Sequence, residues 1–207
     1  WTDYPDNLER FSFFSGSVME ALKALAFAPT VIHTFSWHTA LVPALLKIYY
    51  RRDPLFRETR TLFTIPNAAF QGLFPGNLFS RTTLPAHFFS TEFYEYYGMI
   101  NLLKGGVLFS DWITTISKRY ARDIQSERHG HGLDGVFRDR AATLTGIVNG
   151  LDCREWDPEK DPYNWKIRFN RDKLDRKAAI KKQLLVETGI PAERHNFPLF
   201  IFISRMD

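Results

Sequence analysis

The segment Thr30-Val31-Ile32-His33-Thr34-Phe35 decides the fold, because this β-branched run stands between two stretches of helical periodicity. Residues 8–26 repeat apolar side chains at three- and four-residue spacing, which predicts a helix, and residues 37–50 repeat the pattern. A second β-branched run covers residues 60–65 and ends at Pro66. Helices alternating with short apolar strands predict an α/β fold with a parallel sheet.

The alternation continues up to about residue 148, with less regular spacing. Residues 67–91 are rich in Gly and Pro and predict mostly a long loop. The pattern then predicts helices at 92–103 and 118–125, and strands at 106–110, 112–117 and 143–148. Several of these strands are apolar on both faces, which is typical of a parallel sheet covered on two sides.

The composition changes near Asn149. Residues 149–170 are rich in Asp, Pro, Trp, Asn and Gly and have no periodicity, which predicts a linker. A charged helix is predicted at 171–188, followed by a buried strand at 197–204. We therefore expect one α/β domain over 1–148, a crossover over 149–170, and the start of a second domain over 171–207.

Composition excludes several classes of protein. The 207 residues include 19 Phe and carry a formal net charge of +4, which excludes intrinsic disorder. A single cysteine, Cys153, excludes a disulfide framework. No apolar run is long enough to span a bilayer, and the start shows no secretory signal. We expect a cytoplasmic protein, or a plastid one if the source is a plant or alga. The absence of an initial methionine and the apolar run at the end lead us to expect an internal segment of a longer protein.

Common catalytic and binding motifs are not evident. The histidine pairs His33/His38 and His129/His131 lack the spacing and further ligands of a zinc site, so we expect no metal. No Gly-x-Ser-x-Gly turn and no Gly-rich phosphate loop is present, and we expect no resident cofactor. The basic stretch 171–182 is interrupted by aspartates and predicts a solvated helix face rather than a nucleic-acid surface.

Polar and aromatic side chains follow the predicted strands. They lie in the segments 36–39, 66–72 and 149–152, which combine Trp, His, Asn, Gln and Ser or Thr. In open parallel sheets, ligands bind outside the carboxyl ends of the strands. This chemistry suits a sugar site, and ordinary loop and helix-cap composition explains it equally well.

The chain resembles the bacterial glycogen synthases and plant starch synthases. The resemblance rests on these short motifs in this order: Arg10-Phe11-Ser12-Phe13-Phe14-Ser15, Val31-Ile32-His33, Trp37-His38-Thr39-Ala40, Phe70-Gln71-Gly72, Tyr97-Gly98-Met99-Ile100-Asn101-Leu102-Leu103-Lys104-Gly105-Gly106, Tyr120-Ala121-Arg122-Asp123-Ile124, Gly132-Leu133-Asp134-Gly135-Val136, Asn149-Gly150-Leu151-Asp152 and Ser204-Arg205. It implies a GT-B architecture, with two Rossmann-like domains and a cleft between them. It further implies retaining transfer of glucose from ADP-glucose to the non-reducing end of an α-1,4-glucan, with no membrane or nucleic-acid partner.

The resemblance also implies roles for single residues. Arg205 matches the family arginine that faces the sugar-nucleotide phosphates, and Asn149 matches an asparagine that positions the transferred glucose. These two are the implied catalytic residues. Substrate-binding positions implied in the same way are Trp37, His38, Asn67, Gln71 and Tyr97.

Two positions depart from the family pattern. The family has His-Asp-Trp-His where this chain has Phe35-Ser36-Trp37-His38, so a serine replaces the aspartate. The family histidine of Thr-(Ile/Val)-His-Asn is replaced by Pro66. Serine supplies no negative charge, and proline has no imidazole. Two hypotheses follow: a diverged glucosyltransferase, or a non-catalytic homologue that binds glucan or partners an active synthase.

Overall fold

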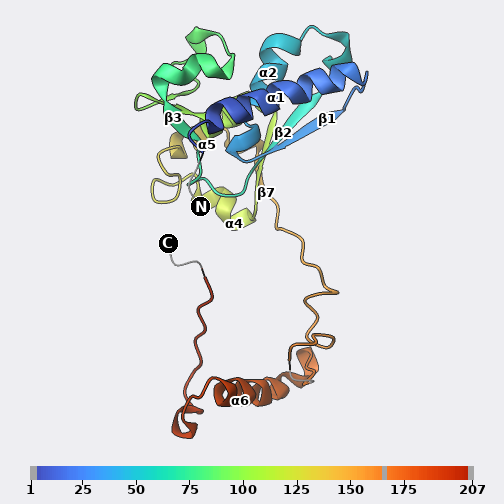
Figure 1. Ribbon diagram of the computed structural model, residues 1–207, viewed down its shortest axis with the longest axis vertical. Coiled ribbons are helices and arrows are strands. Elements are labelled where there is room, and N and C mark those ends of the chain that lie inside the picture. Colours follow the sequence, from blue (N-terminus) through green and yellow to red (C-terminus); the bar gives the residue numbers. More distant parts are fainter. Residues whose placement is uncertain (1–3, 165–166, 205–207) are drawn as a thin grey trace. The chain divides into compact units, whose positions relative to one another are not determined.

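A computed structural model describes residues 4–164 and 167–204 (Figure 1). The chain divides into two compact units, Trp1–Asn149 and Gly150–Asp207. Within the described ranges, every helix is too short or too polar to pass through a bilayer.

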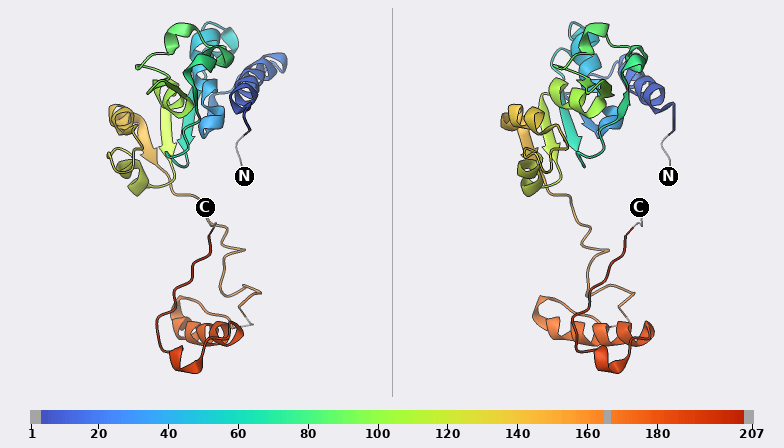
Figure 2. Two further views of the ribbon diagram at one scale, coloured as in Figure 1. Left: turned by 60° about the vertical axis from the view of Figure 1, so that its left-hand side comes forward. Right: turned by 90° about the vertical axis from the view of Figure 1, so that its left-hand side faces the viewer.

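A four-stranded sheet organises the first unit. Its strands are β1 (Val31–Phe35), β2 (Arg60–Ile65), β6 (Trp112–Thr115) and β7 (Leu144–Gly146), and they lie in the order β1-β2-β6-β7. All neighbouring pairs are parallel, which confirms the predicted α/β fold. Figure 2 shows these strands side by side from two further directions. Because the strands are parallel, the loops that follow them leave from the same edge.

The two faces of this sheet differ in burial. Ile32, Phe63 and Ile113 point to the covered face and are buried. Helix α3 (Leu102–Phe109) lies against this face, where Gly106 approaches the ring of Phe63. On the opposite face, Val31, Phe35 and Trp112 are 51%, 52% and 52% exposed. The sequence predicts a sheet covered on both faces, but the described residues cover one face and leave these side chains of the other face exposed.

Several helices of the first unit match the helices that the periodicity of apolar residues predicts. Helix α1 (Asn7–Ala24) packs beside α2 (Leu41–Leu45), as Figure 1 shows. The helix predicted at 37–50 is present in three pieces, since the 3-10 turn η1 (Trp37–Thr39) precedes α2 and the π-helix η2 (Leu46–Tyr50) follows it. Helix α4 (Lys118–Asp123) confirms the helix predicted at 118–125, and α5 (Asp134–Asp139) is an additional short helix.

The predictions for residues 92–110 were wrong. The predicted helix contains β4 (Glu95–Tyr96) and β5 (Met99–Asn101), which form an antiparallel sheet with β3 (Leu73–Pro75) in the order β3-β5-β4. The predicted strand at 106–110 lies mostly in α3. A wholly apolar run fits a buried helix as well as a buried strand, which explains this error. The predicted loop 67–91 also contains the 3-10 helices η4 (Gly76–Thr82) and η5 (Ala86–Phe88).

The second unit contains one long helix. Helix α6 (Lys177–Glu187) follows the 3-10 helix η7 (Arg171–Arg176), which confirms the helix predicted at 171–188, and η8 (Ala192–Arg194) comes after it. The strand predicted at 197–204 was wrong. Residues 198–204 have no regular structure, because the described part of this unit offers no other strand as a hydrogen-bonding partner.

Candidate functional site

The turn after β1 has a strained backbone. Ser36 has φ 63° and ψ 170°, a region that residues with a side chain rarely adopt. The Ser36 amide donates to the carbonyl of Thr64 on β2 at 2.9 Å, which ties the turn to the sheet. The Thr39 hydroxyl accepts from the Phe35 amide at 2.7 Å and donates to the Phe35 carbonyl at 2.9 Å. Neighbouring hydrogen bonds therefore hold this strained turn in place.

Trp37 and His38 form the aromatic centre of the site. Their rings stack with centroids 3.8 Å apart, and the Phe11 ring of α1 packs edge-on against both. Trp37 is buried, while His38 is half-buried and its Nδ1 lies 3.2 Å from the Ser36 hydroxyl. Gly72 contacts the Trp37 ring so closely that a Cβ there would lie 2.6 Å from Cε3. The sequence alone did not show that Gly72 and Phe11 fix this pair.

The loop after β2 lies beside the turn after β1. Asn67 is exposed, and its side-chain oxygen accepts from the Ala69 amide at 2.9 Å, which closes a local turn. The Ala68 amide donates to the Tyr120 hydroxyl at 2.9 Å. Pro66 follows the last residue of β2 and has no amide hydrogen to donate. The contact of Gly72 with the Trp37 ring joins this loop to the aromatic pair.

Gln71 is a buried residue whose amide is fully used within the protein. Its nitrogen donates to the carbonyls of Ala68 at 3.1 Å and His131 at 2.9 Å. Its oxygen accepts from the Asn101 side chain at 2.6 Å. Gln71 therefore fixes the loop after β2 against the segment that carries His131.

A line of polar side chains crosses the less covered face of the sheet near the same edge. His33 Nε2 lies 2.7 Å from the Thr64 hydroxyl, which in turn lies 2.6 Å from the Thr114 hydroxyl. The sequence alone gave this line no role. A threonine near the end of each strand is the signal that could have revealed it, because the register of the parallel pair places Thr64 beside Thr114 on one face.

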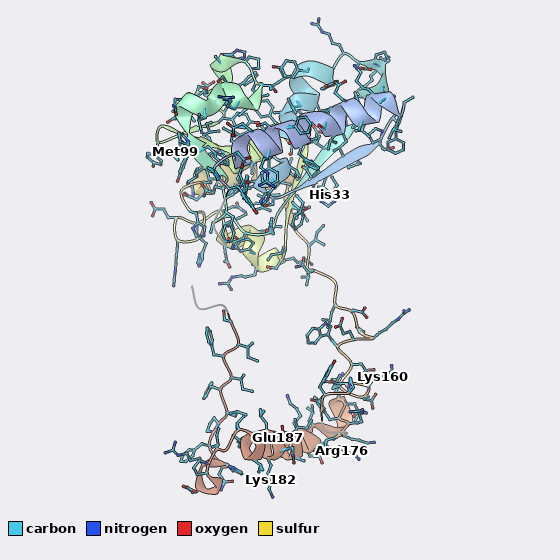
Figure 3. The ribbon with its side chains drawn as sticks, viewed as in Figure 1. His33, Met99, Lys160, Arg176, Lys182 and Glu187 are labelled. Atoms are coloured by element: carbon cyan, nitrogen blue, oxygen red, sulfur yellow. The ribbon has the colours of Figure 1, made fainter. Side chains whose placement is uncertain are left out.

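The other predicted site residues belong to other segments of the chain. Tyr97 is 87% exposed in the turn between β4 and β5. Figure 3 labels Met99 of β5 and His33 of β1, which lie well apart in the first unit. Asn149 is exposed in the segment that follows β7. Arg205 lies outside the described residues. The structure thus brings Ser36, Trp37, His38 and the 66–72 loop together.

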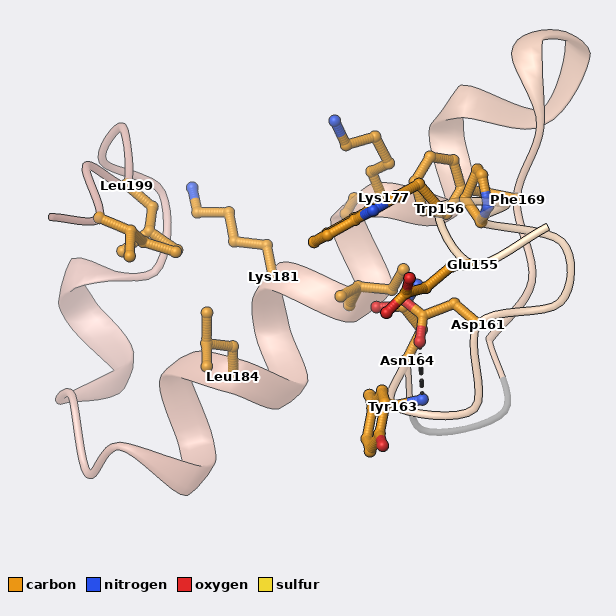
Figure 4. A pocket seen from close by; sticks show the side chains of 14 residues that line it. Glu155, Trp156, Asp161, Tyr163, Asn164, Phe169, Lys177, Lys181, Leu184 and Leu199 are labelled. Atoms are coloured by element: carbon orange, nitrogen blue, oxygen red, sulfur yellow. Dashed lines mark hydrogen bonds between the residues drawn. The ribbon is translucent and has the colours of Figure 1, made fainter. Parts of the chain in front are cut away.

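A hollow of about 850 Å³ lies in the second unit, as Figure 4 shows. It is lined largely by apolar side chains of α6 and by the rings of Trp156 and Phe169. Lys177 lies over the Phe169 ring at 5.5 Å, and Lys181 donates to the Phe197 carbonyl at 2.6 Å. This hollow contains none of the predicted site residues. Among the described residues, no three His, Cys, Asp or Glu side chains are grouped to hold a metal ion.

The strand-end site has the chemistry of saccharide recognition. The half-buried ring of His38, stacked on the buried Trp37, offers an aromatic surface, and the amide of Asn67 and the hydroxyl of Ser36 can form hydrogen bonds. Ser36, Pro66 and Asn67 provide no carboxylate, and the titratable side chain beside them is the imidazole of His38.

A solved structure shares this architecture. The catalytic domain of starch synthase IV from Arabidopsis thaliana, bound to ADP and acarbose, matches 92% of this chain with a TM-score of 0.75 and 28% sequence identity. The match covers 39% of that chain. The parallel α/β unit and this likeness assign the chain to the GT-B fold class.

Sequence comparison identifies the family. The model of the starch synthase catalytic domain matches residues 1–139. Glycogen synthase 2 of Geobacter sulfurreducens is 46% identical over 99% of this chain, and glycogen synthase of Koribacter versatilis is 42% identical over 98%. The chain belongs to the starch synthase catalytic domain family, in which its relatives are glycogen synthases. It spans 42% and 41% of the lengths of these two relatives.

Proposed function

We propose that the whole protein is a retaining glucosyltransferase that moves glucose from ADP-glucose to the non-reducing end of an α-1,4-glucan. The conformation of the turn after β1 carries this proposal. Ser36 has a strained φ of 63°, and the Trp37–His38 stack follows it directly. Strain of this kind costs about 1–3 kcal/mol and is typical of functional sites.

In this proposal, each part of the chain has a place in a two-domain enzyme. Residues 1–148 form the later part of the acceptor-side domain, 149–170 the crossover, and 171–207 the start of the nucleotide-sugar domain. Arg205 neutralises the leaving diphosphate, because a guanidinium pairs with phosphate oxygens in two hydrogen bonds. Asn149 positions the transferred glucose.

The saccharide contacts come from the strand-end site and one outlying aromatic residue. His38 presents its half-buried ring, which the buried Trp37 holds in place by stacking, Asn67 offers an amide, and Tyr97 offers an exposed ring. Gln71 contributes by holding the loop of Asn67, because its own amide is already saturated.

The replaced positions favour a second candidate, a non-catalytic homologue that binds glucan or partners an active synthase. Ser36 cannot supply the negative charge of the family aspartate, and Pro66 cannot supply an imidazole. A binding protein needs the aromatic pair and the amide, and it does not need those two groups.

Glucose incorporation from ADP-glucose into glycogen by the whole protein tests the proposal. We expect incorporation by the natural protein, and UDP-glucose in parallel reports the donor preference. A Ser36→Asp, Pro66→His double variant reports whether the family groups still fit. A protein without incorporation that cosediments with glycogen would contradict the enzyme and support the binding homologue. Residues 1–207 alone are expected to transfer no glucose, because the chain spans about two fifths of its relatives.

A further inference from the structure

A second polar hollow, of about 520 Å³, lies at the amino-terminal end of β2 in the first unit. Arg60 is the first residue of β2, and Asp111 immediately precedes β6. Because these strands are parallel, this is the edge of the sheet opposite Ser36 and Asn67. The side chains that line it are Leu46, Lys47, Arg51, Phe56, Arg57, Thr59, Arg60 and Asp111.

The charges in this hollow do not balance. It contains four cationic residues and the single carboxylate of Asp111. Lys47 Nζ lies 3.0 Å from an oxygen of that carboxylate, whose other oxygen accepts from the Thr61 amide at 2.8 Å and its hydroxyl at 2.9 Å. Burial alone would raise the pKa of Asp111, but these hydrogen bonds outweigh it and lower the pKa, so the carboxylate stays ionised. Asp111 therefore neutralises Lys47 and leaves three arginines.

These arginines have little to neutralise them. Arg57 Nε lies 3.8 Å from Glu58, but both side chains are more than 80% exposed, where an ion pair contributes little. The guanidinium groups of Arg51 and Arg60 form no hydrogen bond or ion pair with any residue in the described ranges. Three guanidinium groups on one hollow repel one another, and a bound anion would remove that repulsion.

The backbone that carries these cations is firmly held. Asp53 caps the 3-10 helix η3 (Pro54–Phe56) by accepting from the Leu55 amide at 3.0 Å. Phe56 is 2% exposed. The Arg60 amide donates to the Thr30 carbonyl at 3.0 Å. The backbone of the hollow is therefore in place before any ligand arrives, and binding has only to order the exposed side chains of Arg51, Arg57 and Arg60.

An apolar hollow adjoins the cationic one. It has a volume of about 470 Å³, shares Arg60 and Asp111 with the first, and is lined by Val31, Leu62 and the half-exposed ring of Trp112. A ligand whose anionic group sits on the arginines can thus place an apolar group against an aromatic ring.

We propose that this pair of hollows binds a small phosphate monoester, with the phosphate on Arg51, Arg57 and Arg60 and the organic group against Trp112. Guanidinium groups match the geometry of phosphate oxygens and remain charged at every physiological pH. The site is separate from the strand-end site and does not depend on glucosyl transfer.

Calorimetric titration of the whole protein with inorganic phosphate and with phenyl phosphate tests the proposal. We expect saturable binding of both probes, with phenyl phosphate binding more tightly. An Arg51→Ala, Arg60→Ala variant should weaken both by about tenfold or more, since it removes two charge-assisted contacts. Arg52→Ala is the matched control, because Arg52 is exposed, adjacent to Arg51 and outside the lining, and it should leave binding unchanged. Trp112→Ala should remove only the advantage of phenyl phosphate.

Three results would overturn the phosphate site: no saturable binding of either probe, unchanged binding in the double variant, or an equal loss in Arg52→Ala. Equal affinities of the two probes, unaffected by Trp112→Ala, would overturn the placement of the organic group. Thermal unfolding shows whether each variant is folded. If the alanine variant does not fold, the Arg51→Lys, Arg60→Lys variant takes its place in the titration. Lysine keeps the positive charge but cannot form the paired hydrogen bonds of a guanidinium group, so the binding of both probes should still weaken.

Discussion

Two segments made of β-branched and aromatic residues have opposite environments in the two units. Strand β6 of the first unit lies between β2 and β7, and its Ile113 is fully buried. Residues 200–203 of the second unit are Phe-Ile-Phe-Ile, and Ile203 is 92% exposed in a segment without regular structure. β propensity is equally high in both, so neighbouring strands, rather than the segment itself, determine whether a strand forms.

The same contrast extends to the cores. Among the described residues, all buried apolar side chains except Leu185 belong to the first unit. The side chains of α6 that are not buried line the hollow of Figure 4 or face solvent. Stability of the first unit should therefore depend on single core contacts, while the second unit should tolerate the same changes.

The largest expected effect on stability comes from replacing one isoleucine in each of these two segments. Ile113→Ala should lower the free energy of unfolding by about 2–5 kcal/mol, because it removes buried methyl groups and leaves a cavity. Ile203→Ala should change it by less than about 0.5 kcal/mol. Urea unfolding followed by tryptophan fluorescence measures both. Equal losses would show that residues 200–203 are buried in solution.

Glycine replacement tests how closely the first unit is packed. A Cβ on Gly105 would lie 1.9 Å from Cε1 of the fully buried Tyr94, so Gly105→Ala should cost about 3 kcal/mol. Gly16→Ala in the middle of α1 meets no atom within 4 Å and should stabilise the protein by up to about 1 kcal/mol. The midpoints of thermal unfolding compare the two variants. A Gly105→Ala variant as stable as the natural chain would mean that α3 can move away from Tyr94.

The glycines of α3 also show where sequence analysis reached its limit. Strands β1, β2, β6 and β7 could be predicted, because β-branched runs next to Pro66 or polar turns are clear signals. The sequence predicted a helix that ends at residue 103 and a strand that begins at Gly106. In the structure Gly105 and Gly106 let α3 approach Tyr94 and Phe63, a tertiary cause that no local pattern contains.

The candidate site at the strand ends could also be predicted only in part. Residues 36–39 and 66–72 could be placed at one edge because parallel strands end together. The strain at Ser36 and the saturated amide of Gln71 depend on partners as distant as Thr64 and His131, so the sequence could not reveal them. The cationic hollow was missed because Lys47, Arg51, Arg60 and Asp111 meet only after three elements have packed.

The smallest predicted effect on stability comes from replacing an ionised carboxylate, and each unit provides one for comparison. Asp111 accepts hydrogen bonds from buried Thr61, whereas Asp157 of the second unit accepts from the Glu159 amide and pairs with Lys160, whose side chain is 74% exposed. Asp111→Asn should cost about 1 kcal/mol at pH 7, because a charge-assisted hydrogen bond becomes a neutral one. Asp157→Asn should lower the free energy of unfolding by less, and added salt should reduce this loss further because it screens exposed charges.

The pH dependence distinguishes the two cases by its sign and extent. The pKa of Asp111 is lower in the folded than in the unfolded chain, so its contribution to stability is complete above the unfolded value of about 4 and is lost as the pH falls through the folded value. The stability difference between the natural chain and Asp111→Asn should therefore shrink from pH 5 downward, measured by urea unfolding at constant ionic strength. A difference that stays constant down to acid pH would show that Asp111 stabilises by packing alone, and the carboxylate would then not be the charge that holds Lys47.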